Sequence, residues 1–143
     1  MKRVAIISPL NARSKTHQNR NLRYARKCLR DSLSRGEAPY ASHLLYPQVL
    51  DDNDEVERSV GMDAGQAWEE QSELYAVCVD LGVTDGMTRS IERANQLGIP
   101  VDMRLIGPVE DAPARKRRSD AGVKRGPRSR PEEDITDEVE SDD

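Results

Sequence analysis

The sequence is poor in the side chains that build disulfides and metal sites. Its 143 residues include two cysteines, Cys28 and Cys78, and two histidines, His17 and His43. Each cysteine lies in an apolar pattern, one in an expected helix and one in an expected strand. We therefore expect two buried free thiols, which are typical of a reducing compartment, rather than a disulfide. No His/Cys spacing indicates a metal site, and the sequence predicts neither a metal nor another cofactor.

Long hydrophobic runs are also missing. No segment approaches the ~18 apolar residues that a membrane span needs, and the first residues contain no apolar signal core. The pattern predicts a cytoplasmic protein that does not contact a membrane.

Charge is distributed unevenly along the chain. Residues 107–143 hold eight of the 22 Lys and Arg and eleven of the 26 Asp and Glu, so the formal net charge of −4 comes mostly from this segment. Its four prolines and few large apolar side chains predict a tail without a fixed fold, because little buried surface would offset the entropy of ordering. Its basic block, residues 115–130, could contact nucleic acid or a protein, or could be screened by the acidic block that follows.

Residues 1–106 are nearly neutral and form the expected domain. Alternating strand and helix patterns predict a three-layer, Rossmann-like α/β fold with a small, mostly parallel sheet. Short apolar runs predict strands at 3–8, 39–45, 73–79 and 101–106, the last at a sheet edge because apolar and charged residues alternate in it. Apolar stripes predict helices at 19–35, 54–70 and 85–97.

The expected helix at 54–70 has an apolar stripe and a glycine ridge. The stripe consists of Val56, Val60, Ala64 and Ala67. The chain has no phenylalanine, and its single tryptophan, Trp68, is expected to pack in the core rather than to stack on a base. Gly61 and Gly65 lie four residues apart and predict a smooth ridge that another helix or backbone approaches closely.

The stretch from Glu73 to Ala94 is the candidate functional region. It comprises a buried strand, a glycine-containing loop with two carboxylates, Asp80 and Asp85, and the start of a helix. Small ligands in α/β proteins lie beyond the carboxyl ends of strands and against helix N-termini. Gly82 and Gly86 allow the backbone to turn or to approach a ligand closely. The alternative is an ordinary strand, loop and helix without a ligand.

Further residues of the predicted pocket follow the neighbouring strands, because parallel strands end at one edge of the sheet. Ser8 and Pro9 follow the first strand, and His43, for which a structural role is the alternative, lies near the end of the second. Asp80 and Asp85 are the candidate catalytic residues. The candidate ligand-binding residues are Ser8, Pro9, His43, Gly82, Gly86, Met87 and Ser90.

Several local patterns together carry a resemblance to a known family. They are VAIISPL at 4–10, NLRYARKCLRDSLSRGEAPYASHLLY at 21–46, GMDAGQAW at 61–68, VDLGVTDGM at 79–87 and IERANQLGIPV at 91–101. With them the chain resembles the nucleoside 2-deoxyribosyltransferase-like superfamily, and within it an uncharacterised branch from bacteriophages and prophages. The resemblance covers much of residues 1–106 and implies the same fold and a nucleoside or nucleotide-like ligand.

The resemblance also bears on the chemistry. In the enzymes of this superfamily, a glutamate four residues beyond a loop glycine attacks the anomeric carbon, and counting from Gly86 this position is Ser90. Glu92 lies roughly 200° further around the helix, and the family's aspartate at the start of the third strand is matched by Glu73. The resemblance thus implies a nucleoside- or nucleotide-binding domain with weak or absent deoxyribosyl transfer.

Two other hypotheses stay open. One is an active N-glycosidic hydrolase or transferase that uses Asp80 or Asp85, and the other is a structural or partner-binding protein, including a homo-oligomer.

Overall fold

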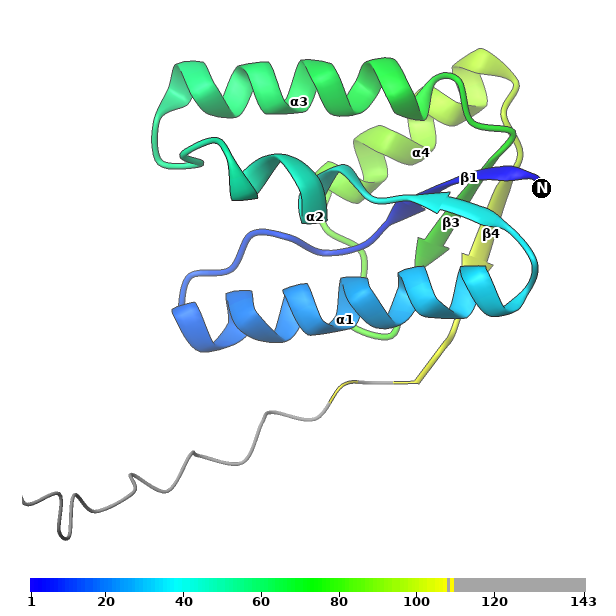
Figure 1. The fold of residues 1–143 in the computed structure, drawn as a ribbon, viewed down its shortest axis with the longest axis horizontal. Coiled ribbons are helices and arrows are strands. Elements are labelled where there is room, and N and C mark those ends of the chain that lie inside the picture. Colours follow the sequence, from blue (N-terminus) through cyan, green and yellow to red (C-terminus); the bar gives the residue numbers. More distant parts are fainter. Residues whose placement is uncertain (108, 110–143) are drawn as a thin grey trace, which may run out of the picture. The chain divides into compact units, whose positions relative to one another are not determined.

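Figure 1 shows the computed structural model, which describes residues 1–107 and 109. The predicted charged tail lies outside the described residues, apart from its first positions. The described part contains the strands β1 (Arg3–Ile7), β2 (Ala38–Tyr40), β3 (Leu74–Cys78) and β4 (Val101–Arg104). It also contains the helices α1 (Lys15–Ser34), α2 (Ser42–Leu45), α3 (Glu55–Glu69) and α4 (Asp85–Leu97), and a 3₁₀ turn, η1 (Tyr46–Gln48).

The strands form one parallel sheet in the order β2-β1-β3-β4. In Figure 1, α1 lies on one side of the sheet, and α3 and α4 lie on the other. Helices on both faces are usual for a parallel sheet, whose central strands are then apolar on both sides. The predicted α/β class and the edge position of β4 are confirmed.

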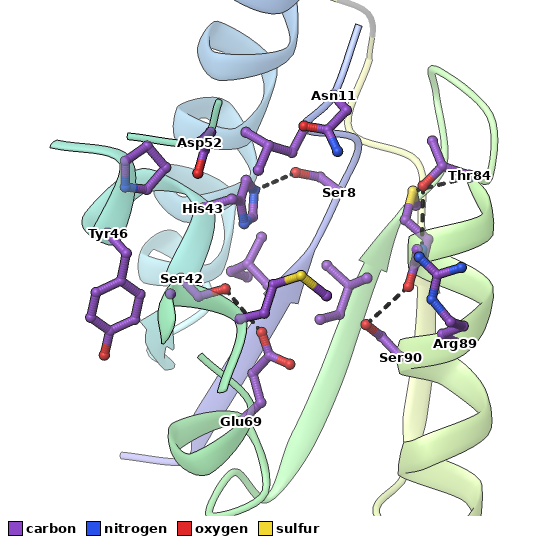
Figure 2. A pocket seen from close by; sticks show the side chains of 18 of the residues that line it. Ser8, Asn11, Ser42, His43, Tyr46, Asp52, Glu69, Thr84, Arg89 and Ser90 are labelled. Carbon is purple, nitrogen blue, oxygen red and sulfur yellow. Dashed lines mark hydrogen bonds between the residues drawn. The ribbon is translucent and has the colours of Figure 1, made fainter. Parts of the chain in front are cut away.

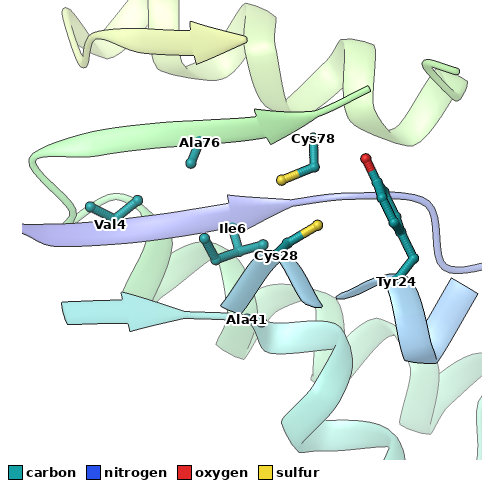
Figure 3. Packing of buried hydrophobic residues seen from close by; sticks show 7 residues of the cluster. All are labelled: Val4, Ile6, Tyr24, Cys28, Ala41, Ala76 and Cys78. Atoms are coloured by element: carbon teal, nitrogen blue, oxygen red, sulfur yellow. The ribbon is translucent and has the colours of Figure 1, made fainter. Parts of the chain in front are cut away.

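Alternate residues of β1 serve two separate cores. Val4 and Ile6 pack against Tyr24 and Cys28 of α1, and Ala5 lies in the second core on the α4 side. Figure 3 shows the first core, in which Cys28 and Cys78 lie in the same group of buried side chains. Both cysteines are buried and free, as predicted.

Helix α1 begins at Lys15, four residues before the predicted start at residue 19. The side chain of Ser14 accepts a hydrogen bond from the backbone N–H of His17 (3.2 Å) and so caps the first turn. The capped first turn therefore extends the helix beyond its predicted start.

The prediction of a strand over residues 39–45 is wrong from Ala41 onwards. The strand β2 ends at Tyr40, which pairs with Ala5, and Ser42 opens the short helix α2. Leu44 reaches the core on the α1 side from this helical turn. A short apolar run suits either structure, and here the helical turn satisfies it.

Helix α3 turns its apolar stripe away from the core. Val56, Val60 and Trp68 are 74%, 53% and 63% exposed. The predicted core position of Trp68 is therefore wrong, and its ring instead lies 6.3 Å from that of Tyr40, between centroids.

Another helix approaches the glycine ridge of α3 closely, as predicted. A Cβ atom on Gly65 would lie 2.9 Å from the Cβ of Ser42, so only glycine lets α2 approach α3 this closely.

Within the described residues, none of the helices combines the length and the apolar character that a membrane crossing requires.

Candidate functional site

A cavity of about 440 Å³ lies at the carboxyl end of β1. The end of β1 and the loop after it form one wall, α2 and α3 form a second, and the first turns of α4 form a third (Figure 2). The three walls meet because parallel strands release their loops at the same sheet edge. Of the predicted site residues, the cavity is lined by Ser8, His43, Asp85, Gly86, Met87 and Ser90.

Ser8 and His43 form a hydrogen bond in this cavity. The hydroxyl of Ser8, at the end of β1, lies 2.8 Å from Nε2 of His43 in α2. Burial lowers the pKa of His43 to about 4, so the imidazole is neutral at physiological pH. Which of the two groups donates depends on the tautomer of the ring, and in either case the pair offers polar atoms to a ligand.

The N-terminus of α4 forms the opposite wall. Thr84 caps it, because its hydroxyl accepts from the N–H of Met87 (3.3 Å). Asp85 lies in the exposed first turn, where the helix dipole favours a negative charge. Ser90 follows one turn later, and its hydroxyl donates to the carbonyl oxygen of Gly86 (3.2 Å).

Asp80, Gly82 and Pro9 are not among the residues that line the cavity. The carboxylate of Asp80 instead accepts hydrogen bonds from the hydroxyl of Tyr24 (2.5 Å) and from the backbone N–H groups of Ile106 and Gly107 (both 2.9 Å). Burial opposes its ionisation, but these hydrogen bonds outweigh burial and hold the pKa of Asp80 below its ordinary value. The structure thus brings Asp85 to the cavity and directs Asp80 into the fold.

Glu73 also lies away from the cavity. Its carboxylate accepts from the backbone N–H of Arg3 (2.8 Å), at the residue where β1 begins. The cavity lies at the other end of this strand.

Sequence reasoning missed a buried carboxylate of the cavity, Glu69, at the last turn of α3. It lines the cavity, its side chain is only 10% exposed, and its Oε1 accepts from the hydroxyl of Ser42 (3.0 Å). Its Oε2 lies 3.8 Å from Nη1 of Arg93. Burial raises the pKa of Glu69, against the opposing effects of Ser42 and Arg93. The available signal was its spacing, since Glu69 continues the inward ridge of Gly61 and Gly65.

The cavity also holds charges of both signs. Arg58 of α3 and Arg89 of α4 line it, together with Asp52. A second, more open cleft adjoins it, and Asn11, Asp52 and Arg58 line both hollows. The cleft adds the cationic residues Arg13 and Lys15. Among the described residues, no group of three or more His, Cys, Asp or Glu side chains is arranged to hold a metal ion.

A parallel sheet covered on both faces, with a cavity at its carboxyl edge, defines a small Rossmann-like α/β domain. The same fold occurs in a solved 2-deoxyribosyltransferase from the psychrotolerant bacterium Bacillus psychrosaccharolyticus, with a TM-score of 0.51. The two chains are 14% identical, and the similarity covers 71% of this chain and 70% of the other. No curated protein matches the sequence.

The chain belongs to the family described as "Domain of unknown function (DUF7768)", whose model matches residues 2–104. This match covers the whole sheet and all the helices of the described part.

Proposed function

We propose that this domain binds a nucleoside or nucleotide in the cavity between β1, α3 and α4 and does not carry out covalent deoxyribosyl transfer. The observation that carries the proposal is the position of Ser90. It lies in the cavity wall, one turn into α4, with its hydroxyl bonded to its own helix. An alcohol in this state has no base to activate it and is a poor nucleophile.

The cavity suits a ligand of this class. Its volume of about 440 Å³ lies within the ~300–1,000 Å³ usual for small-molecule sites. Apolar side chains such as Ile7 and Met87 line it beside the polar Ser8–His43 pair. A base can therefore be covered by apolar atoms while the sugar hydroxyls reach hydrogen-bonding partners.

The adjoining cleft favours a nucleotide over a nucleoside. Arg13, Lys15 and Arg58 line the cleft, and Arg58 lies at the boundary with the cavity. Guanidinium and ammonium groups are the usual partners of phosphate oxygens. Origin in a bacteriophage, a cytoplasmic location and a role of Asp80 or Asp85 in catalysis remain predictions.

Binding can be tested by thermal unfolding of the full chain with ribo- and 2′-deoxyribonucleosides and their 5′-monophosphates. A ligand at 100 times its Kd stabilises the folded state by about 2.7 kcal/mol. A domain of this size gains roughly 4–8 °C in Tm per kcal/mol, so we expect an increase of about 10 °C or more. If none of these compounds raises Tm, the proposed function is wrong.

The missing nucleophile can be tested with Ser90→Glu. We expect the wild type to exchange no base between deoxyribonucleosides, and Ser90→Glu to introduce exchange together with a covalent glycosyl adduct detectable by mass spectrometry. Thr88→Glu is the matched control, because it adds the same charge to an exposed position of α4 outside the cavity. Base exchange by the wild type, at a rate that Ser90→Ala does not change, would contradict the proposal.

A further inference from the structure

Glu69 is a buried carboxylate that has only weak partners in the fold. One oxygen accepts from the neutral hydroxyl of Ser42, and the other lies 3.8 Å from Arg93, beyond hydrogen-bond distance. Burial of a carboxylate is unfavourable unless charges and hydrogen bonds compensate it fully. The partners of Glu69 compensate it only in part, so a structural role explains its position poorly.

The orientation of α3 also indicates that Glu69 has a functional role. This helix turns Val56, Val60 and Trp68 towards solvent and directs Glu69 inwards. Burial of apolar area alone would favour the opposite rotation, since each buried aliphatic side chain contributes about 1.5–3 kcal/mol. The rotation that is present brings the charged side chains of Arg58 and Glu69 to the cavity.

Glu69 also lies across the cavity from Ser90. Figure 2 shows the two side chains on opposite sides of the cavity, Glu69 on the α3 side and Ser90 on the α4 side. The cavity of about 440 Å³ that both residues line is large enough for a ligand together with a water molecule, which occupies about 30 Å³ in the liquid.

We propose that Glu69 is a catalytic residue that acts as general base in the hydrolysis of the N-glycosidic bond of the bound nucleoside or nucleotide. This inference rests on the proposed function and adds a reaction to it. Among the described residues, the other two carboxylates of the cavity suit the role less well, because Asp85 lies in an exposed helix turn and Asp52 lies at the boundary with the open cleft. A buried carboxylate is the better base at neutral pH, as its affinity for a proton is higher.

The reaction consumes one water molecule. Its oxygen forms a bond to the anomeric carbon while its proton passes to the carboxylate of Glu69. The carbon–nitrogen bond breaks, its electron pair remains on the nitrogen of the base, and that nitrogen takes up a proton from solvent. Glu69 then returns its proton to solvent, so the products are a free base and a sugar with an anomeric hydroxyl. Because water, and not a protein side chain, attacks the anomeric carbon, the sugar is released by hydrolysis and is not transferred to a second base.

The pH dependence should report Glu69. The rate is expected to rise with pH as Glu69 loses its proton, over a range above that of an ordinary glutamate. Four charged or titratable groups of the described residues influence Glu69. They are Arg93 of α4, Glu70 at the end of α3, Tyr75 of β3 and Tyr40 of β2. The tyrosines keep their protons near neutrality, because burial raises the pKa of Tyr75 to about 12 and also raises that of Tyr40.

The experiment measures release of free base by chromatography from the ribo- and deoxyribonucleosides and 5′-monophosphates named above, with the full chain. We expect the wild type to hydrolyse at least one of them and Glu69→Gln to be at least about 100-fold slower, with its ligand-induced rise in Tm retained. Glu55→Gln is the matched control, because this glutamate lies at the exposed other end of α3 and outside the cavity, and it should keep the wild-type rate.

A second variant keeps the test valid if Glu69→Gln does not fold. The hydrogen bond from Ser42 lowers the pKa of Glu69, so Ser42→Ala should shift the rising limb of the pH–rate profile to higher pH. A purely structural role of Ser42 would change Tm without moving this limb.

Three outcomes would overturn the inference. Binding without hydrolysis by the wild type would refute the reaction and leave the proposed function standing. Glu69→Gln within a few-fold of the wild-type rate, or an unshifted profile in Ser42→Ala, would assign the chemistry to another residue. Absence of both binding and hydrolysis would refute the proposed function as well.

Discussion

Asp80 allows a test of whether the carboxylate after β3 serves the ligand or the fold. Its Oδ2 accepts from the hydroxyl of Tyr24 and from the N–H of Ile106, and its Oδ1 accepts from the N–H of Gly107. The hydroxyl of Tyr24 in turn accepts from the N–H of Asp80 (2.9 Å). Asp80 therefore fastens the segment after β4 to α1, and its replacement should lower stability.

The size of the loss follows from the number of acceptors. In Asp80→Asn, the single amide oxygen can keep the bonds to Tyr24 and Ile106, but the new NH₂ group then faces the N–H of Gly107. One partly buried donor loses its acceptor, which costs about 1–3 kcal/mol. In a domain of this size, this corresponds to a fall in Tm of roughly 5–20 °C. Asp80→Ala removes all three acceptor bonds and should cost more.

The assay is urea unfolding of the full chain, followed by circular dichroism, together with the thermal screen for ligands. Asp85→Asn is the control, because this exposed carboxylate contributes at most about 1 kcal/mol through the helix dipole. The pKa of Asp80 is lowered in the folded state, so its contribution is complete above the ordinary aspartate pKa of ~4 and is lost below it. The difference between wild type and Asp80→Asn should thus shrink in acid.

One result would refute this reasoning. If Asp80→Asn unfolds at the wild-type temperature but no longer responds to any ligand that stabilises the wild type, Asp80 serves the site and not the fold.

Two further predictions concern the fold. Arg104, whose side chain is 3% exposed, donates two hydrogen bonds to Glu37 (2.8 and 2.7 Å), and these bonds hold the pKa of Glu37 at about 2. Arg104→Met should lower the free energy of unfolding, measured in urea at pH 7, by about 3–5 kcal/mol. The difference in stability between wild type and variant should shrink as the pH falls from ~4.5 towards 2 and Glu37 takes up a proton. A difference under about 1 kcal/mol at pH 7 would contradict the prediction. The fluorescence of Trp68 should be red-shifted and readily quenched by acrylamide, as expected of an exposed indole. A blue-shifted emission that is protected from acrylamide at low protein concentration would mean that Trp68 is buried and that the outward rotation of α3 is wrong. A blue shift that develops only as the concentration rises would indicate that α3 mediates self-association.

Much of the candidate site could be predicted because its signals are local. Residues 74–97 form the strand, loop and helix that the sequence predicts, since an apolar run, a capping threonine and a helical stripe all lie within them. Gly98, with φ of +70°, caps α4 directly after Leu97, the last residue of the predicted helix. Ser8 and His43 could be assigned to the cavity because parallel strands end at the same edge.

The partners of the carboxylates could not be predicted in this way. Asp80 is bound by Tyr24, 56 residues before it, and by Ile106, 26 residues after it. Glu69 is bound by Ser42, 27 residues before it. No local pattern encodes such pairs. The sequence around a carboxylate at a strand end is therefore the same whether the carboxylate faces a ligand or binds the backbone.

The sequence by itself determined the α/β class, the order of the four strands and the three long helices, and the buried free cysteines, because these depend on the local periodicity of apolar residues. Only the tertiary structure decided which side of α3 faces the sheet and which carboxylate enters the cavity. The rotation of a helix depends on the elements packed against it, and α2 contacts the glycine ridge of α3 so closely that Val56, Val60 and Trp68 turn outwards and Glu69 turns inwards. Periodicity shows that a helix has two faces, and packing chooses between them.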